Sequence, residues 1–200
     1  MRIVTAQELE NWLATGKVLE KDGRGPKVVE LSNGLFLKIF HTRRHPLLAR
    51  LQPAAQRFAR NAERLQQRKV AAPKVIELLW LNRKIGLSAC LYQPLPGQSV
   101  EQLYCAAPQQ ADALLEPLAR FIRHLHQQGI YFRSLHLGNI LLLPDGQYGL
   151  IDILDLQSKQ RPLNGWLIQR NFQHLRHYLK RKKLSDFPIE RLLQHYWEAS

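Results

Sequence analysis

Apolar residues recur along the chain with two different periods, and the change between them divides the sequence. Up to residue 92, short apolar runs of strand length predominate, interrupted by one stretch with helical spacing. After residue 97, apolar residues stand three or four apart over long stretches, which predicts helices. We expect strands at 17–20, 27–31, 35–40, 75–80 and 86–92, and helices at 6–14, 48–69, 109–128, 166–182 and 188–198.

A proline-rich break and a short hairpin complete this pattern. The segment Gln93-Pro94-Leu95-Pro96-Gly97 contains residues that end regular structure. Beyond it, residues 139–143 and 148–151 have the pattern of two short strands around a turn. The sequence therefore predicts an α+β, two-lobe fold. Its parts are a β-rich N-terminal lobe with one long helix at 1–92, a hinge at 93–97 and a reduced helical lobe at 98–200.

The charge of the chain indicates which classes of partner it can bind. The net formal charge is +13, and basic residues gather at 38–74 and 176–183. Such a chain attracts nucleic acid, anionic lipid or phosphorylated substrates. No zinc-finger spacing, aromatic RNA-binding signature or basic zipper accompanies the charge, so nucleic-acid binding is the disfavoured interpretation.

Membrane and secreted classes are disfavoured as well. No apolar run reaches the roughly 18–20 residues that a membrane span needs. The N-terminus lacks the apolar segment of a secretory signal, and Cys90 and Cys105 have no disulfide-scaffold or zinc spacing. We therefore expect a cytoplasmic protein.

Lys38 is the one charged residue in the apolar run 35–40. An unpaired buried ammonium group is costly, so its side chain should meet a carboxylate or an anion. Glu63 is the one acid between Leu31 and Ile76, and we expect it to pair with Lys38. The alternative is a lysine that reaches solvent, with Glu63 exposed.

Asn139 and Asp152 stand thirteen residues apart across the predicted hairpin. That spacing can bring an amide oxygen and a carboxylate to one end of the hairpin, and both are ligands suited to Mg²⁺. Taken singly, Asn139 has the alternative role of a turn residue and Asp152 that of a capping residue.

The same region carries a family resemblance. Leu135-His136-Leu137-Gly138-Asn139-Ile140-Leu141, followed by Leu150-Ile151-Asp152, resembles the catalytic loop and metal segment of kinase-like phosphotransferases. Segments 21–28, 37–40 and 57–65 resemble a narrower group, the lipopolysaccharide core sugar kinases (Kdo/heptose kinase-like). Within that group they resemble the bacterial toluene tolerance proteins. The similarity runs from about residue 17 to residue 157.

The resemblance implies ATP and Mg²⁺ as cofactors and gives each candidate residue a role. Lys38 would bridge the α- and β-phosphates, and Glu63 would orient it. Gly23 and Gly25 would let backbone amides approach the phosphates. The remaining roles are Tyr92 in the hinge for the adenine, His136 near the γ-phosphate, and Asn139 and Asp152 for Mg²⁺.

Ser134 departs from the family pattern. The family has an aspartate five residues before the asparagine, and a serine cannot accept a proton as that carboxylate does. Losing a general base typically costs about 10²–10⁴ in rate. The resemblance therefore implies a slow enzyme, or one that recruits His136 or Asp155 as its base. The 48 residues after Asp152 are too few for the full helical lobe of a protein kinase.

We therefore expect an ATP-dependent phosphotransferase of lipopolysaccharide core modification. Its acceptor would be an anionic glycolipid or a sugar phosphate, and the protein would lie peripherally at the cytoplasmic face of the inner membrane. Two alternatives stay open. One is a pseudokinase scaffold or regulator of envelope lipopolysaccharide assembly without turnover, which Ser134 favours. The weaker one is a basic nucleic-acid-binding domain.

Overall fold

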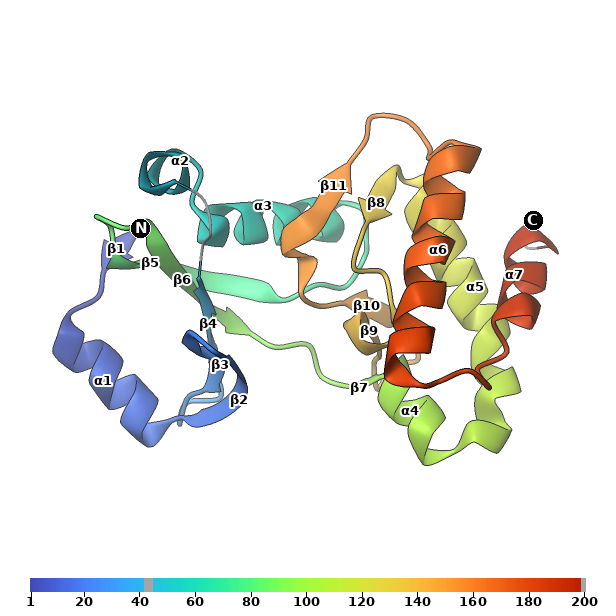
Figure 1. Cartoon of the computed structure of the whole chain (residues 1–200), viewed down its shortest axis with the longest axis horizontal. Helices are drawn as coiled ribbons and strands as arrows, with labels where there is room; N and C mark the ends of the chain where they lie inside the picture. The colour runs from blue at the N-terminus through green and yellow to red at the C-terminus, as the bar shows by residue number, and fades with distance from the viewer. Residues whose placement is uncertain (42–44, 199–200) are drawn as a thin grey trace. The chain divides into compact units, whose positions relative to one another are not determined.

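A computed structural model describes residues 1–41 and 45–198 (Figure 1). The chain divides into two compact units, one formed by residues 1–63 and 73–94 and the other by 64–72 and 95–200. Each is described by itself. Arg43 and Arg44, which belong to the first basic cluster of the sequence, lie outside the described residues.

The first unit is built on a six-stranded sheet with the order β1-β5-β6-β4-β3-β2. Strand β1 pairs with β5 in parallel, and the other neighbours are antiparallel, so the sheet is mixed. The strands are β1 (Arg2–Ile3), β2 (Lys17–Asp22), β3 (Gly25–Glu30), β4 (Phe36–Phe40), β5 (Lys74–Asn82) and β6 (Leu87–Gln93).

Alternation along β4 gives the sheet two different faces. Leu37 and Ile39 join an apolar cluster to which helix α1 (Ala6–Thr15) adds Leu9, Trp12 and Leu13. Because successive side chains of a strand point to opposite faces, Lys38 belongs to the other face. There its cross-strand neighbours are Val28 and Cys90.

Helix α3 (Ala54–Gln67) places Phe58 on the Lys38 side of the sheet. The Phe58 ring packs near Phe40 and Tyr92, at centroid distances of 5.6 and 5.8 Å. The single helix expected at 48–69 is wrong. It is two helices, α2 (Pro46–Leu51) and α3, because Pro53 disfavours helical geometry at Gln52.

The second unit combines helices with short strands. Strands β9 (Ile140–Leu142) and β10 (Tyr148–Leu150) form the expected hairpin, and β7 (Gln98–Ser99) adds to β9. Strand β8 (Ile130–Phe132) pairs with β11 (Leu156–Ser158). The helices are α4 (Val100–Ala106), α5 (Ala111–Gln127), α6 (Gly165–Lys182) and α7 (Ile189–Glu198).

Helix α4 and strands β8 and β11 were not expected from the apolar pattern. Helix α4 does carry a sequence signal, because Ser99 and Gln102 form a capping box in which each side chain meets the other residue's backbone amide. The two three-residue strands have no comparable signal. Their pairing joins segments more than twenty residues apart, so only the folded chain defines it.

His126 forms a buried junction between three helices of this unit. Its Nδ1 accepts from the Tyr196 hydroxyl of α7 at 2.8 Å, and its Nε2 donates to Asn171 Oδ1 of α6 at 3.1 Å. Asn171 is held in that orientation because its Nδ2 donates to the Phe132 carbonyl at 2.8 Å. Burial lowers the pKa of His126 from 6.5 to about 4, so the ring is neutral near pH 7.

The combination of one mixed sheet, two small antiparallel sheets and several helices in the described residues confirms the α+β class. In the part of the chain that the structure describes, every helix falls short of the length and apolar character that crossing a bilayer requires.

The His126 junction predicts an acid-sensitive fold. The unfolded state binds more protons than the folded state between pH 6.5 and about 4, so stability should fall as pH drops through that window. The pKa difference corresponds to about 3 kcal/mol at the acid end. In urea denaturation at several pH values, His126→Gln should flatten this slope, whereas the control His124→Gln, at an exposed position of the same helix, should not. Equal slopes in both variants would contradict the assignment.

Candidate functional site

The β9–β10 hairpin brings Asn139 and Asp152 to the same end. Ile140 is paired with Leu150, and the Ile151 amide donates to the Asn139 carbonyl at 3.0 Å. Asn139 therefore lies just before the first residue of one strand, and Asp152 follows the other strand. Asp152 is exposed and adopts left-handed backbone geometry, with φ 51°.

The segment 133–139, called here the 133–139 loop, is fixed by hydrogen bonds at both ends. At its start, the Phe132 carbonyl accepts from the Leu135 amide at 3.0 Å as well as from Asn171. At its end, Asn139 Nδ2 lies 3.1 Å from the Ser134 carbonyl and 3.3 Å from His136 Nε2. Buried Leu135 and Leu137 anchor the middle of the loop. The loop is therefore preorganised.

These bonds decide which atom of Asn139 faces a ligand. Both engage the amide nitrogen, which leaves the amide oxygen for a cation. Asp152 adds a carboxylate at the same end of the hairpin. Such a pair of protein oxygen donors suits Mg²⁺, since this ion is usually bound through one or two protein groups plus substrate phosphates and water.

His136 is stacked face to face on Tyr178 of α6, with ring centroids 3.9 Å apart. The Tyr178 hydroxyl donates to Glu101 Oε2, and Lys182 Nζ lies 3.0 Å from Glu101 Oε1. A Cβ at Gly138 would come within 2.8 Å of both the tyrosine and the glutamate oxygen, so a side chain there would displace these two groups. The contacts among His136, Tyr178, Glu101 and Lys182 hold the 133–139 loop against α6.

This environment keeps His136 neutral. Burial, followed by the positive charge of Arg181, lowers the pKa of His136 from 6.5 to about 4. Because Asn139 donates to its Nε2, the ring proton sits on Nδ1, which is buried and has no partner among the described residues. Burial alone would raise the pKa of Glu101, but the bonds from Tyr178 and Lys182 outweigh it and lower that pKa.

Ser134, at the position where the family pattern has an aspartate, is bonded to another carboxylate. Its Oγ donates to Asp155 Oδ2 at 2.8 Å. The second oxygen, Oδ1, is enclosed without a hydrogen-bond partner in the described part of the chain. Burial raises the pKa of Asp155, and the bond from Ser134 opposes that shift. The Asp155 carboxylate is thus hydrogen-bonded directly to the hydroxyl of Ser134.

The candidate phosphate-binding residues lie in the first unit. Lys38 Nζ is 5.9 Å from the centre of the Phe58 ring. Burial raises the pKa of the neighbouring Cys90 thiol to about 12, so the thiol stays neutral. Glu63 lies exposed on α3, the helix that carries Phe58. The ion pair between Lys38 and Glu63 stays a prediction.

The glycine turn is open to solvent, whereas Tyr92 is buried. Gly23 and Gly25 lie at the β2–β3 turn with open space around them, and Gly25 has φ 115°. Asp22 Oδ1 already accepts the Arg24 amide of this turn at 2.8 Å. Tyr92 is buried near the end of β6, where its ring meets Phe36 edge-on at 5.6 Å. Their nucleotide roles stay predictions.

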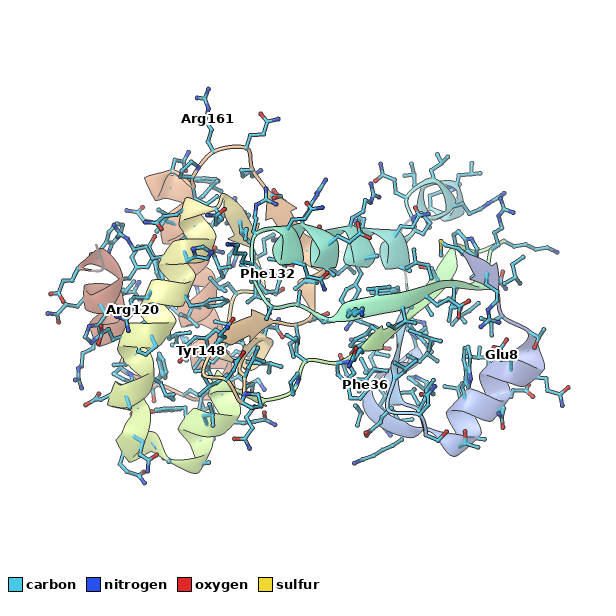
Figure 2. All side chains as sticks on the ribbon, turned by 180° about the vertical axis from the view of Figure 1, so that it is seen from behind. Glu8, Phe36, Arg120, Phe132, Tyr148 and Arg161 are labelled. Atoms are coloured by element: carbon cyan, nitrogen blue, oxygen red, sulfur yellow. The ribbon has the colours of Figure 1, made fainter. Side chains whose placement is uncertain are left out.

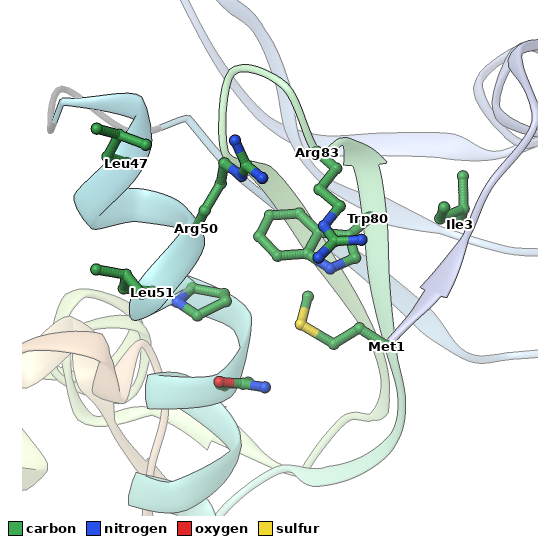
Figure 3. Close-up of a pocket in the computed structure, with 9 residues that line it drawn as sticks. Met1, Ile3, Leu47, Arg50, Leu51, Trp80 and Arg83 are labelled. Atoms are coloured by element: carbon green, nitrogen blue, oxygen red, sulfur yellow. The ribbon is translucent and has the colours of Figure 1, made fainter.

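Two hollows open on the first unit. One, of about 490 Å³, has Glu63 on its wall together with Arg60 and Leu78. The other, of about 610 Å³, lies between α2 and the sheet edge and contains none of the predicted site residues (Figure 3). Its labelled lining residues are Met1, Ile3, Leu47, Arg50, Leu51, Trp80 and Arg83.

Several residues that shape the loop were missed from sequence. Glu101, Asn171 and Tyr178 lie far along the chain from the loop that they support. Asn171 and Tyr178 are seven residues apart, which places them on one face of α6 and was the only available signal. Asp155 was named only as a possible base, and its bond to Ser134 was not foreseen.

The tyrosine network can be tested by removing one hydroxyl. Tyr178→Phe keeps the stack on His136 but leaves Glu101 without its bond, so stability should fall by about 1–2 kcal/mol. Tyr131 is a matched control, because its buried hydroxyl has no partner among the described residues. Tyr131→Phe should be neutral or stabilising in urea denaturation. A loss at Tyr131 equal to that at Tyr178 would contradict this account.

Comparison with known proteins shows the family of the chain. The family model described as "Phosphotransferase enzyme family" (APH) matches residues 21–134, more than half of the chain. The matched segment contains the glycine turn, Lys38 and Glu63 and ends at Ser134. No curated protein shows a significant match. The chain belongs to the phosphotransferase enzyme family, within the protein-kinase-like superfamily.

Proposed function

We propose that this protein transfers the γ-phosphoryl group of ATP to a hydroxyl acceptor. The observation that carries the proposal is the hairpin end, where the backbone brings Asn139 and Asp152 together and the bonds of the 133–139 loop engage the amide nitrogen of Asn139. Phosphotransferases of this family generally use ATP with Mg²⁺. In this proposal the two units are the two lobes of a kinase-like fold.

In this proposal each candidate residue has its own role toward the nucleotide. Lys38 binds the α- and β-phosphates and Glu63 orients it, while Gly23 and Gly25 admit phosphate to the β2–β3 turn. The backbone after Tyr92 receives the adenine. Asn139 and Asp152 hold Mg²⁺, which when bound neutralises phosphate charge.

His136 and Asp155 are the two candidates for the base that takes the proton of the acceptor hydroxyl. His136 is disfavoured because its low pKa makes it a weak base and its Nε2 already accepts a hydrogen bond from Asn139. Asp155 is the carboxylate that lies against the loop, behind Ser134. A pseudokinase scaffold is the second candidate function, favoured by the serine at position 134. Turnover on a core-sugar acceptor would exclude it.

The acceptor that we favour is a sugar of the lipopolysaccharide core. Several arginines lie near the loop. The charge of Arg181 contributes to the lowered pKa of His136. For His174 burial is the largest cause of the lowered pKa, and the charges of Arg133 and Arg170 add to it. Such surroundings suit a phosphorylated acceptor or an anionic glycolipid. The basic end of α6, including exposed Lys180 and Lys183, suits an anionic membrane surface.

Nucleotide binding is the first test. Mg·ATP at a hundred times its Kd should stabilise the fold by about 2.7 kcal/mol, or roughly 5–10 °C in Tm for a chain of this size. Asp152→Asn should abolish the magnesium-dependent part of this shift. Asp145→Asn, an exposed aspartate at the turn of the same hairpin, is the matched control and should keep it. Folded protein that shows no shift at millimolar Mg·ATP would refute the proposal.

Membrane association is tested separately. Lys182 pairs with Glu101, so the informative changes are Lys180→Glu with Lys183→Glu, which should weaken sedimentation with anionic vesicles by about 1 kcal/mol per residue. Reversing Lys159 and Arg161, exposed elsewhere on the same unit (Arg161 is labelled in Figure 2), changes net charge equally and should have little effect. Equal losses would show a general charge effect and no local membrane surface.

A further inference from the structure

We propose that Ser134 is itself a phosphoryl acceptor, taking the γ-phosphoryl group of ATP bound to the same chain while Asp155 receives its proton. The proposal rests on the proposed function, because it needs ATP to bind. It adds a modification site within the 133–139 loop.

The bond between Ser134 and Asp155 is that of a nucleophile and its base. Ser134 Oγ donates to Asp155 Oδ2 at 2.8 Å, so its proton already points at the group that would take it. Asp155 Oδ1 is enclosed and lacks a partner among the described residues. Burial raises the pKa of this carboxylate, which makes it a stronger base than an exposed aspartate.

No other serine hydroxyl in residues 1–41 and 45–198 lies as close to a carboxylate. Ser88 is fully buried and lies 3.3 Å from the Ala55 amide, and Ser99 caps α4. Ser185 is exposed and lies 3.5 Å from Asp186 Oδ1. Ser134 differs from these serines because it and the carboxylate that it bonds are both half-buried, and the hydrogen bond between them is 2.8 Å long.

The loop also places this hydroxyl beside the proposed nucleotide site. The Ser134 carbonyl is bonded by Asn139 Nδ2 at 3.1 Å, so the hydroxyl and the amide oxygen proposed for Mg²⁺ belong to the same turn. Phosphoryl transfer depends mostly on positioning and charge stabilisation, and little other chemistry is asked of the protein.

The step balances with ATP as the only co-reactant. A bond forms between Ser134 Oγ and the γ-phosphorus, and the bond from that phosphorus to the β,γ-bridging oxygen breaks. ADP leaves with the electron pair of the broken bond. The hydroxyl proton passes to Asp155 Oδ2. Nothing is oxidised or reduced.

The experiment needs no knowledge of the natural acceptor. The full chain is first treated with a phosphatase and then incubated with Mg·ATP alone, and intact-mass measurement and peptide mapping follow the product. We expect one phosphoryl group on Ser134, appearing at a rate that does not depend on protein concentration. Ser134→Ala should remove the signal, and Ser134→Thr should retain it.

Matched variants separate the chemistry from structural effects. Ser185→Ala should behave as the wild type. Asp155→Asn should slow phosphorylation by about 10²-fold or more, yet keep the rise in Tm that Mg·ATP produces. Asp152→Asn should lose phosphorylation together with the magnesium-dependent rise in Tm, which excludes a contaminating kinase.

Three results would overturn the proposal. A Tm rise with Mg·ATP but no phosphate on Ser134 would refute self-phosphorylation and leave the proposed function standing. Phosphate on Ser134 at an unchanged rate in Asp155→Asn would refute the role of the carboxylate. The absence of any Tm rise in folded protein would refute nucleotide binding, and both proposals with it.

Discussion

The side-chain amide of Asn171 is the interaction on which the geometry of the second unit depends. One end of it donates to the Phe132 carbonyl, and the other accepts from His126. Because a buried polar group left unpaired costs about 1–3 kcal/mol, these bonds fix α6 against α5 and against the start of the 133–139 loop. The loop is therefore placed by helix packing, and its own short sequence does not have to specify that position.

A second layer of contacts gives the loop its chemistry. Burial and the charge of Arg181 lower the pKa of His136 and keep the ring neutral, and a neutral Nε2 can accept from Asn139. That bond engages the amide nitrogen of the asparagine, which lies at the same hairpin end as Asp152. The loop has lost the aspartate of the family pattern, but Asp155 keeps a carboxylate within 2.8 Å of the serine that replaces it.

Local sequence patterns predicted most of the helices and strands. They failed for elements that form only through contacts between segments far apart in the chain. The apolar run at 35–40 predicted β4, and the two short strands expected around a turn beyond the proline-rich break are β9 and β10. The helix expected at 48–69 failed because apolar spacing continued through Pro53, whose ring ends the helical geometry. Strands of three residues such as β8 carry too few positions for a period to show.

By itself the sequence determined the α+β class, the family resemblance and the hairpin that joins Asn139 to Asp152, because each depends on residues close together in the chain. Only the tertiary structure decided the state of those side chains. Burial sets the pKa of His136, and α6 supplies the ring that stacks on it. The bond from Ser134 to Asp155 spans twenty-one residues of chain, and only folding brings their atoms within 2.8 Å.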